Sequence, residues 1–214
     1  MLNILFITDY VCPYCLVAKE ALVQALAETG LEADIQMQPF ELTEEPKERV
    51  DTCHDEVRKA HYQILVEPAR QLGLDMKLPP RVIPRPYTRL AFEGWYYAKD
   101  RGYGDAYSDL MYRAYFIDEK DIGDLEVLEE LAAGLGLNPA EFRAALETGT
   151  YAKAEKSAVA YAKRELQIKG VPTIFVNGKK ISLQTYTKEE MISILTQQAS
   201  ASKGGFSCGP DGCN

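Results

Sequence analysis

Apolar residues open the chain as a short run and then shift to a helical spacing. Residues 3–8 are mostly apolar, and a run this short is typical of a buried strand. From Cys12 to Thr29 apolar side chains recur at helical spacing, and Gly30 follows as a residue suited to end a helix. Residues 33–39 alternate between apolar and polar side chains, which predicts a half-buried strand. The opening of the chain therefore predicts a β-α-β unit.

The pattern from about residue 42 to residue 168 is helical almost throughout. Asp124, Asn138 and Thr88 are residue types that cap the first turn of a helix. Helices are expected over 89–101, 125–135, 139–147 and 151–168. Residues 78–86 hold four prolines, which exclude regular structure there. This long segment predicts a helical region interrupted by a proline-rich loop.

Strand signals return only near the end of the chain. Residues 173–176 are β-branched and aromatic, residues 177–178 are Asn-Gly, and residues 179–183 read as the return strand of a hairpin. A last amphipathic helix is expected over 187–199. Residues 200–214 have little to bury and predict a flexible tail. This end therefore predicts a β-β-α unit.

The two units predict an α/β fold with one small mixed sheet and helices on its faces. Residues 1–41 and 169–199 are expected to form this sheet domain. Residues 42–168 are expected to form a large all-helical insertion beside it, and residues 200–214 a tail. Ten of the 21 aromatic residues lie between positions 85 and 116, and most of these ten side chains should lie in the core of the insertion.

Composition and charge narrow the class of protein. The chain has 214 residues, of which 46% are hydrophobic and 26% charged, as in an ordinary globular protein. Its net charge of −8 argues against nucleic acid and against an anionic membrane as a partner. No apolar run approaches the roughly 18 residues of a membrane span. The start of the chain has no basic region and no small-residue cleavage site, so we expect a cytoplasmic protein.

Four of the five cysteines form two close pairs at opposite ends of the chain, and the first pair carries the candidate chemistry. Cys12-Pro13-Tyr14-Cys15 follows a strand and opens a helix. The unpaired N–H groups and the dipole at a helix start stabilise a thiolate at Cys12, and Pro13 suits an early helical position. Cys15 lies on the same face and can attack a mixed disulfide formed at Cys12. The motif predicts a dithiol redox site, with a structural disulfide or half of a zinc site as alternatives.

The second pair, Cys208 and Cys213, flanks a Pro-Asp-Gly turn that can bring the two thiols within disulfide range. We hypothesise that this pair exchanges electrons with the first pair or with an external reductant. The alternatives are incidental thiols or a metal-binding tail. Cys53 is expected to occupy a buried position on a helical stripe. His54 and His61 are seven residues apart, not the four of a two-histidine metal face, so no metal site is expected.

Two blocks of the sequence resemble the thioredoxin superfamily, namely residues 6–15 and residues 170–179, which include Val171-Pro172-Thr173 at the mouth of a strand. The large helical insertion between them is similar to that of the DsbA family. Residues 113–116 and 121–128 resemble the FrnE-like branch of that family. The resemblance implies a thioredoxin fold over nearly the whole chain.

The family resemblance also implies roles for individual residues. Cys12 would be the nucleophile and Cys15 the resolving thiol, and Pro172 would be a cis proline packed against the two cysteines. Pro13, Tyr14 and Val171 would contact the substrate, with the Val171 backbone pairing with the substrate chain as an added strand. Some FrnE-like proteins carry a C-terminal pair similar to Cys208 and Cys213.

We therefore expect a thiol–disulfide oxidoreductase that acts on protein thiols or disulfides and needs no organic cofactor. Its redox partner would be a thioredoxin-type or glutathione-type reductant. One alternative is a glutathione-dependent isomerase or transferase on the same topology, although such relatives usually carry serine at the position of Cys12 and lack Cys15. Another alternative is a cysteine-rich metal-binding protein or a holdase.

Overall fold

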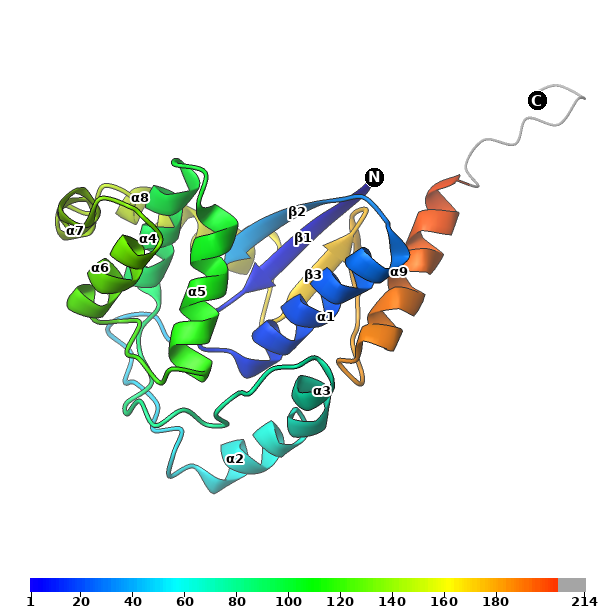
Figure 1. Cartoon of the computed structure of the whole chain (residues 1–214), viewed down its shortest axis with the longest axis horizontal. Coiled ribbons are helices and arrows are strands. Elements are labelled where there is room, and N and C mark those ends of the chain that lie inside the picture. Colours follow the sequence, from blue (N-terminus) through cyan, green and yellow to red (C-terminus); the bar gives the residue numbers. More distant parts are fainter. Residues whose placement is uncertain (204–214) are drawn as a thin grey trace, which may run out of the picture.

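The computed structural model describes residues 1–203, and the strands in this part of the chain form one mixed sheet (Figure 1). The strands are β1 (Leu2–Thr8), β2 (Ala33–Pro39), β3 (Thr173–Val176) and β4 (Lys179–Ile181). They lie in the order β2-β1-β3-β4. β1 runs parallel to β2 and antiparallel to β3, and β4 is antiparallel to β3. The predicted α/β class and the two units flanking a helical insertion are confirmed.

Helices make up most of the remaining chain. In chain order they are α1 (Pro13–Thr29), α2 (Glu56–Gln63), α3 (Val66–Gln71), α4 (Arg89–Lys99), α5 (Gly104–Phe116), α6 (Leu125–Gly134), α7 (Pro139–Glu147), α8 (Ala152–Ala160), the π-helical turn η1 (Tyr161–Glu165) and α9 (Lys188–Lys203). The helix predicted over 151–168 is thus shorter, because α8 ends at Ala160 and the π-helical turn η1 that continues it ends at Glu165. The last helix extends four residues beyond the predicted end at position 199.

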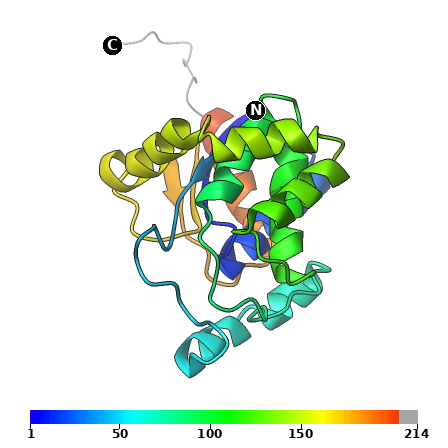
Figure 2. The ribbon, with the colours of Figure 1, turned by 90° about the vertical axis from the view of Figure 1, so that its left-hand side faces the viewer.

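Two different sets of helices cover the two faces of the sheet. On one face, Leu2, Ile4 and Phe6 of β1 form a core with α1 and α9. On the other face, Ile7 packs with Ala162 of η1 and with the loops around it. The insertion therefore returns to cover the second face of the sheet before the chain enters β3. Figure 2, turned by 90°, shows α2 and α3 at one end of the molecule, away from α4–α8.

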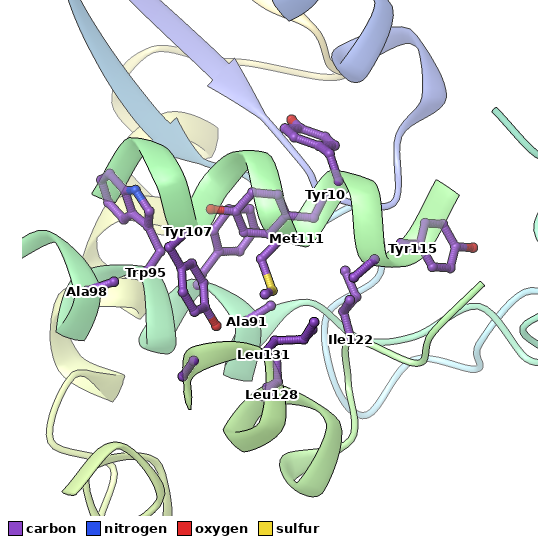
Figure 3. Packing of buried hydrophobic residues seen from close by; sticks show 14 of the residues in the cluster. Tyr10, Ala91, Trp95, Ala98, Tyr107, Met111, Tyr115, Ile122, Leu128 and Leu131 are labelled. Atoms are coloured by element: carbon purple, nitrogen blue, oxygen red, sulfur yellow. The ribbon is translucent and has the colours of Figure 1, made fainter. Parts of the chain in front are cut away.

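An aromatic core fills the insertion, as its composition predicts. The buried aromatic residues of α4 and α5 are Phe92, Trp95, Tyr97, Tyr107, Tyr112, Tyr115 and Phe116. Figure 3 shows side chains from α4, α5 and α6 pointing into one cluster together with Tyr10 from the loop after β1. Cys12, Cys15 and Leu16 belong to the same cluster. The first turn of α1 is therefore packed directly on the helical insertion.

The segment between β2 and α4 departs most from the predicted helical pattern. Residues 40–55 form no helix, and α2 and α3 are short. Cys53 lies in a bend, half-buried, with its thiol donating to the Pro80 carbonyl at 3.2 Å. The prediction that Cys53 is buried on a helical stripe is wrong, because Cys53 lies in an irregular segment before α2 and is only half-buried. The segment is held instead by side-chain bonds such as that from Arg85 to the Thr43 hydroxyl, at 2.9 Å.

Gly94 marks the closest packing between α4 and its neighbours. A Cβ atom there would overlap the Tyr107 hydroxyl and lie 2.8 Å from Cζ of Phe142. We expect Gly94→Ala to lower the free energy of unfolding by about 1–3 kcal/mol, which urea denaturation measures. The control is Gly134→Ala, because a Cβ at this helical position meets nothing within 4 Å. It should leave stability unchanged or raise it by about 0.5–1 kcal/mol; equal losses in both variants would contradict the packing argument.

Candidate active site

The two cysteines of the first pair stand where β1 passes into α1. β1 ends at Thr8, and Cys12 is the N-cap of α1 with an extended backbone. Pro13 follows at the first helical position, as predicted. No side chain caps this helix and its first turn holds no acidic residue, so no carboxylate of that turn offsets the positive end of the helix dipole. Cys12 and Cys15 approach each other to 3.3 Å, and both are free thiols.

A loop from the other end of the chain lies against Cys12. The Val171–Pro172 peptide bond is cis, as the family resemblance implies. The Cys12 thiol donates to the Val171 carbonyl oxygen at 3.4 Å. Residues 159 positions apart therefore meet at the candidate nucleophile, and the side chain of Cys12 is only 4% exposed.

Cys15 is buried more deeply than Cys12. It is 0% exposed, and the Thr8 hydroxyl and the Asp9 backbone favour its thiolate without offsetting the effect of burial on its pKa. Burial raises the pKa of the Cys15 thiol well above its ordinary value, and the adjacent Cys12 raises it further. At neutral pH Cys15 is therefore a protonated thiol held beside a more accessible one.

Asp9 fixes the loop that precedes Cys12. Its carboxylate accepts the Leu42 backbone N–H at 2.7 Å and interacts with the Thr88 hydroxyl. Its own carbonyl accepts the Cys12 backbone N–H at 3.0 Å. Burial raises the pKa of Asp9, while its hydrogen bonds and the positive charge of Arg85 oppose that change. Asp9 thus ties the loop before the dithiol to the segment after β2.

Two tyrosines, Tyr14 and Tyr186, lie near the dithiol, and both interact electrostatically with Cys12. The rings of Tyr14 and Tyr186 pack with centroids 5.2 Å apart, and the Tyr14 hydroxyl donates to the His61 carbonyl at 3.0 Å. Tyr186 has a positive φ of 57°. The Glu190 carboxylate holds this conformation by accepting backbone N–H groups, including that of Tyr186 at 2.9 Å. The loop before α9 therefore contributes to the site.

A cavity of about 530 Å³ opens beside the cis-proline loop. Val171, Pro172 and Tyr186 line it on the side of the dithiol, and Lys180 and Ser182 line it from the strand β4 and the residues after it. The predicted substrate contacts Tyr14, Val171 and Pro172 are each half-buried around Cys12, whereas Pro13 is buried. Cys208 and Cys213 lie outside the described residues. Within residues 1–203, no three His, Cys, Asp or Glu side chains gather as metal ligands.

The fold brings to this site four residues that were not predicted from the sequence, namely Thr8, Asp9, Tyr112 and Tyr186. The only local signal for Thr8 and Asp9 is a pair of polar residues at the end of an apolar strand, directly before the helix that opens at the dithiol. Tyr112 and Tyr186 carry no local signal, because distant segments of the chain bring them to the site.

A reduced dithiol at a helix start, faced by a cis proline on a sheet with a helical insertion, defines a thiol-redox protein of the thioredoxin fold. Residues 3–189 match the family described as the DSBA-like thioredoxin domain. The chain belongs to this family.

Several known proteins are similar to this chain in sequence or in fold. YwbO of Bacillus subtilis (strain 168) is 37% identical over 175 residues, which cover 81% of this chain and 86% of that protein. The structure of a probable DsbA oxidoreductase, SCO1869 of Streptomyces coelicolor, covers 100% of this chain and 99% of its own with a TM-score of 0.79 and 26% identity. The cytosolic disulfide reductase DsbM of Pseudomonas aeruginosa, solved with GSH, covers 92% of this chain and 99% of its own at a TM-score of 0.67 and 18% identity. In the described residues, no helix is both long and apolar enough to cross a membrane.

Proposed function

We propose that this protein is a thiol–disulfide oxidoreductase that reduces or oxidises protein substrates through Cys12 and Cys15. The observation that carries the proposal is the pairing of two free thiols at a helix start with the cis-Pro172 loop against the outer one. Disulfide exchange needs an attacking thiolate and a second thiol within reach of the mixed disulfide. Cys12 and Cys15, 3.3 Å apart, are placed for these two roles.

In the reductive direction the cycle transfers two electrons from the protein to its substrate. The Cys12 thiolate attacks one sulfur of the substrate disulfide, that S–S bond breaks, and the first substrate thiolate leaves. Cys15 then loses its proton and attacks Sγ of Cys12, which releases the second substrate thiol. The protein ends with a Cys12–Cys15 disulfide, and a thioredoxin-type or glutathione-type reductant restores the dithiol by the same exchange in reverse.

We further propose that protein chains bind beside the cis-proline loop and that the reaction takes place in the cytoplasm. The Val171 backbone would pair with the substrate as an added strand, and the neighbouring cavity would receive its side chains. The cytosolic disulfide reductase DsbM shares this fold, which supports the cellular compartment that we propose. The FrnE-like assignment and the redox role of Cys208 and Cys213 remain predictions from the sequence.

A redox titration against glutathione tests the proposed function. The chain is equilibrated with mixtures of reduced and oxidised glutathione, trapped with an alkylating reagent, and read by peptide mass spectrometry. The reagent alkylates only reduced thiols. We expect alkylation of Cys12 and of Cys15 to disappear together, in one two-electron transition, as the glutathione mixture becomes more oxidising. A midpoint near −270 mV would indicate a reductant, and one near about −120 mV an oxidant. If no Cys12–Cys15 disulfide forms at any ratio of reduced to oxidised glutathione, the proposal fails.

The variant Cys15→Ser separates this proposal from the isomerase alternative. A structure of 2-hydroxychromene-2-carboxylate isomerase has the same fold, with a TM-score of 0.71 and 16% identity. A glutathione-dependent isomerase or transferase would keep its activity in Cys15→Ser, because that chemistry does not use a second thiol. We expect the opposite, namely that all turnover of disulfide substrates requires Cys15.

A further inference from the structure

A chain of buried hydroxyl groups joins the second cysteine to the helical insertion. Thr8 ends β1 beside the dithiol, and its hydroxyl opposes the burial-driven rise in the pKa of the Cys15 thiol by favouring the thiolate. The Thr8 hydroxyl in turn forms a hydrogen bond with the hydroxyl of Tyr112 on α5. Thr8 is 0% exposed and Tyr112 is 1% exposed. Bulk water therefore does not compete for these contacts, and a low local dielectric strengthens them.

This arrangement meets a specific need of the second half of the exchange cycle. Cys15 must become a thiolate before it can attack the mixed disulfide, but burial favours its protonated form. The Asp9 carboxylate is directed to the Leu42 backbone N–H instead of the thiol. The titratable groups that act on Cys15 include Cys12 beside it, Tyr112 on α5 and Tyr186 from the loop before α9. Each of these groups is neutral or negatively charged, so none of them supplies a positive charge to stabilise the Cys15 thiolate. A neutral hydrogen-bond donor can stabilise it instead.

We propose that Thr8 is a catalytic residue of the resolving step and that Tyr112 is the positioning residue that orients it. This inference rests on the proposed function. The Tyr112 hydroxyl donates to Oγ1 of Thr8, and the Thr8 hydroxyl donates to Sγ of Cys15 as the thiolate forms. Each hydroxyl then acts as a donor along one directed chain.

The atoms of the step balance without a further reagent. The bond between Sγ of Cys15 and Sγ of Cys12 forms while the bond between Cys12 and the substrate sulfur breaks. The proton that Cys15 gives up passes to solvent, and the departing substrate thiolate takes up a proton from solvent when its pKa lies above the pH. Thr8 keeps its own proton throughout and stabilises charge only, as a preorganised donor does in other active sites.

The test separates the first and second exchanges in time. The full-length chain, with Cys53, Cys208 and Cys213 replaced by serine, is mixed with an aromatic disulfide reagent that releases a coloured thiolate at each exchange. Stopped-flow absorbance then reports the attack by Cys12 and the subsequent attack by Cys15 as two phases. We expect Thr8→Val and Tyr112→Phe to slow the second phase about tenfold or more at pH 7. The apparent pKa of that phase should rise, and the first phase should keep its rate.

Two further variants make the result specific. Thr8→Ser retains the hydroxyl and should restore the second phase. Tyr107→Phe is the matched control, because its buried hydroxyl on the same helix has no partner among the described residues and its loss should leave both phases unchanged. Unchanged second phases in Thr8→Val and Tyr112→Phe would overturn the proposal, and so would equal slowing of both phases. A wild-type chain that releases no thiolate from Cys12 would instead overturn the proposed function.

Discussion

Replacing Cys12 with serine should abolish the reduction of a peptide disulfide, whereas replacing Cys15 should arrest the reaction halfway. A serine hydroxyl at neutral pH has almost no anionic form and no base beside it, so Cys12→Ser should lose roughly three orders of magnitude in rate or more. Cys15→Ser retains the attacking thiol, because Cys12 still stands at the helix start against the Val171 carbonyl. It should therefore accumulate a covalent mixed disulfide at Cys12.

Intact-protein mass spectrometry and a coupled turnover assay measure the two outcomes together. The Cys15→Ser chain should gain the mass of one substrate thiol, which a reducing agent removes. The control is Cys53→Ser, since Cys53 lies in a bend outside the dithiol site with its thiol on the Pro80 carbonyl; its turnover should match the unmodified chain. Full activity in Cys12→Ser would show that the chemistry lies elsewhere in the molecule.

The sequence predicts the dithiol half of the site because its signals are local. The strand, the helix and the CxxC spacing lie within one continuous stretch, and Gly30 ends α1 with a φ of 65° as expected. Asp124 and Asn138 also cap their helices through the predicted side-chain bonds. Thr88 stands at the start of α4 but makes no such bond, since its hydroxyl interacts with Asp9 instead.

The rest of the site depends on contacts between distant segments, which periodicity does not encode. Thr8 and Tyr112 are separated by 104 positions. Tyr186 reaches Tyr14 only because Glu190 holds the loop in a left-handed conformation. The irregular region before α4 is similarly fixed by individual bonds, such as that from Arg81 to Glu119. Such bonds leave no repeating pattern of apolar residues to detect.

Three buried carboxyl groups meet where the insertion joins the sheet, and they make stability depend on pH. Glu41 follows β2, while Glu93 lies on α4 and Glu155 on α8; they are 5%, 0% and 0% exposed. Arg89 neutralises Glu93 through a bond of 2.6 Å. Lys163 donates to the backbone carbonyl of Glu41, not to its carboxyl group. Both carboxyl oxygens of Glu155 lack a hydrogen-bond partner within the described residues.

Burial and mutual repulsion therefore favour the protonated forms of Glu41 and Glu155. Burial, followed by the charge of Glu155, raises the pKa of Glu41 to about 8. Burial also raises the pKa of Glu155, and the charge of Glu93 adds to that shift. The folded chain thus binds more protons than the unfolded chain between the ordinary carboxyl range near pH 4.3 and about pH 8. Because the unfolded state binds fewer protons there, the contribution of these groups to stability is present below that range and falls as the pH rises through it.

Glu155→Gln should weaken this dependence, because the amide keeps the shape of the side chain and carries no charge at any pH, while burial still raises the pKa of Glu41. An unpaired buried charge costs about 3–5 kcal/mol. We therefore expect the variant to melt close to the unmodified chain at pH 5 and roughly 5–10 °C above it at pH 9. The matched control is Glu147→Gln, which removes a solvent-exposed partner of Arg143 on α7 and should change the melting temperature little at either pH. If Glu155→Gln lowered the melting temperature equally at pH 5 and pH 9, ionisation of Glu155 would not destabilise the folded chain. That result would refute the claim that burial favours the protonated form of Glu155.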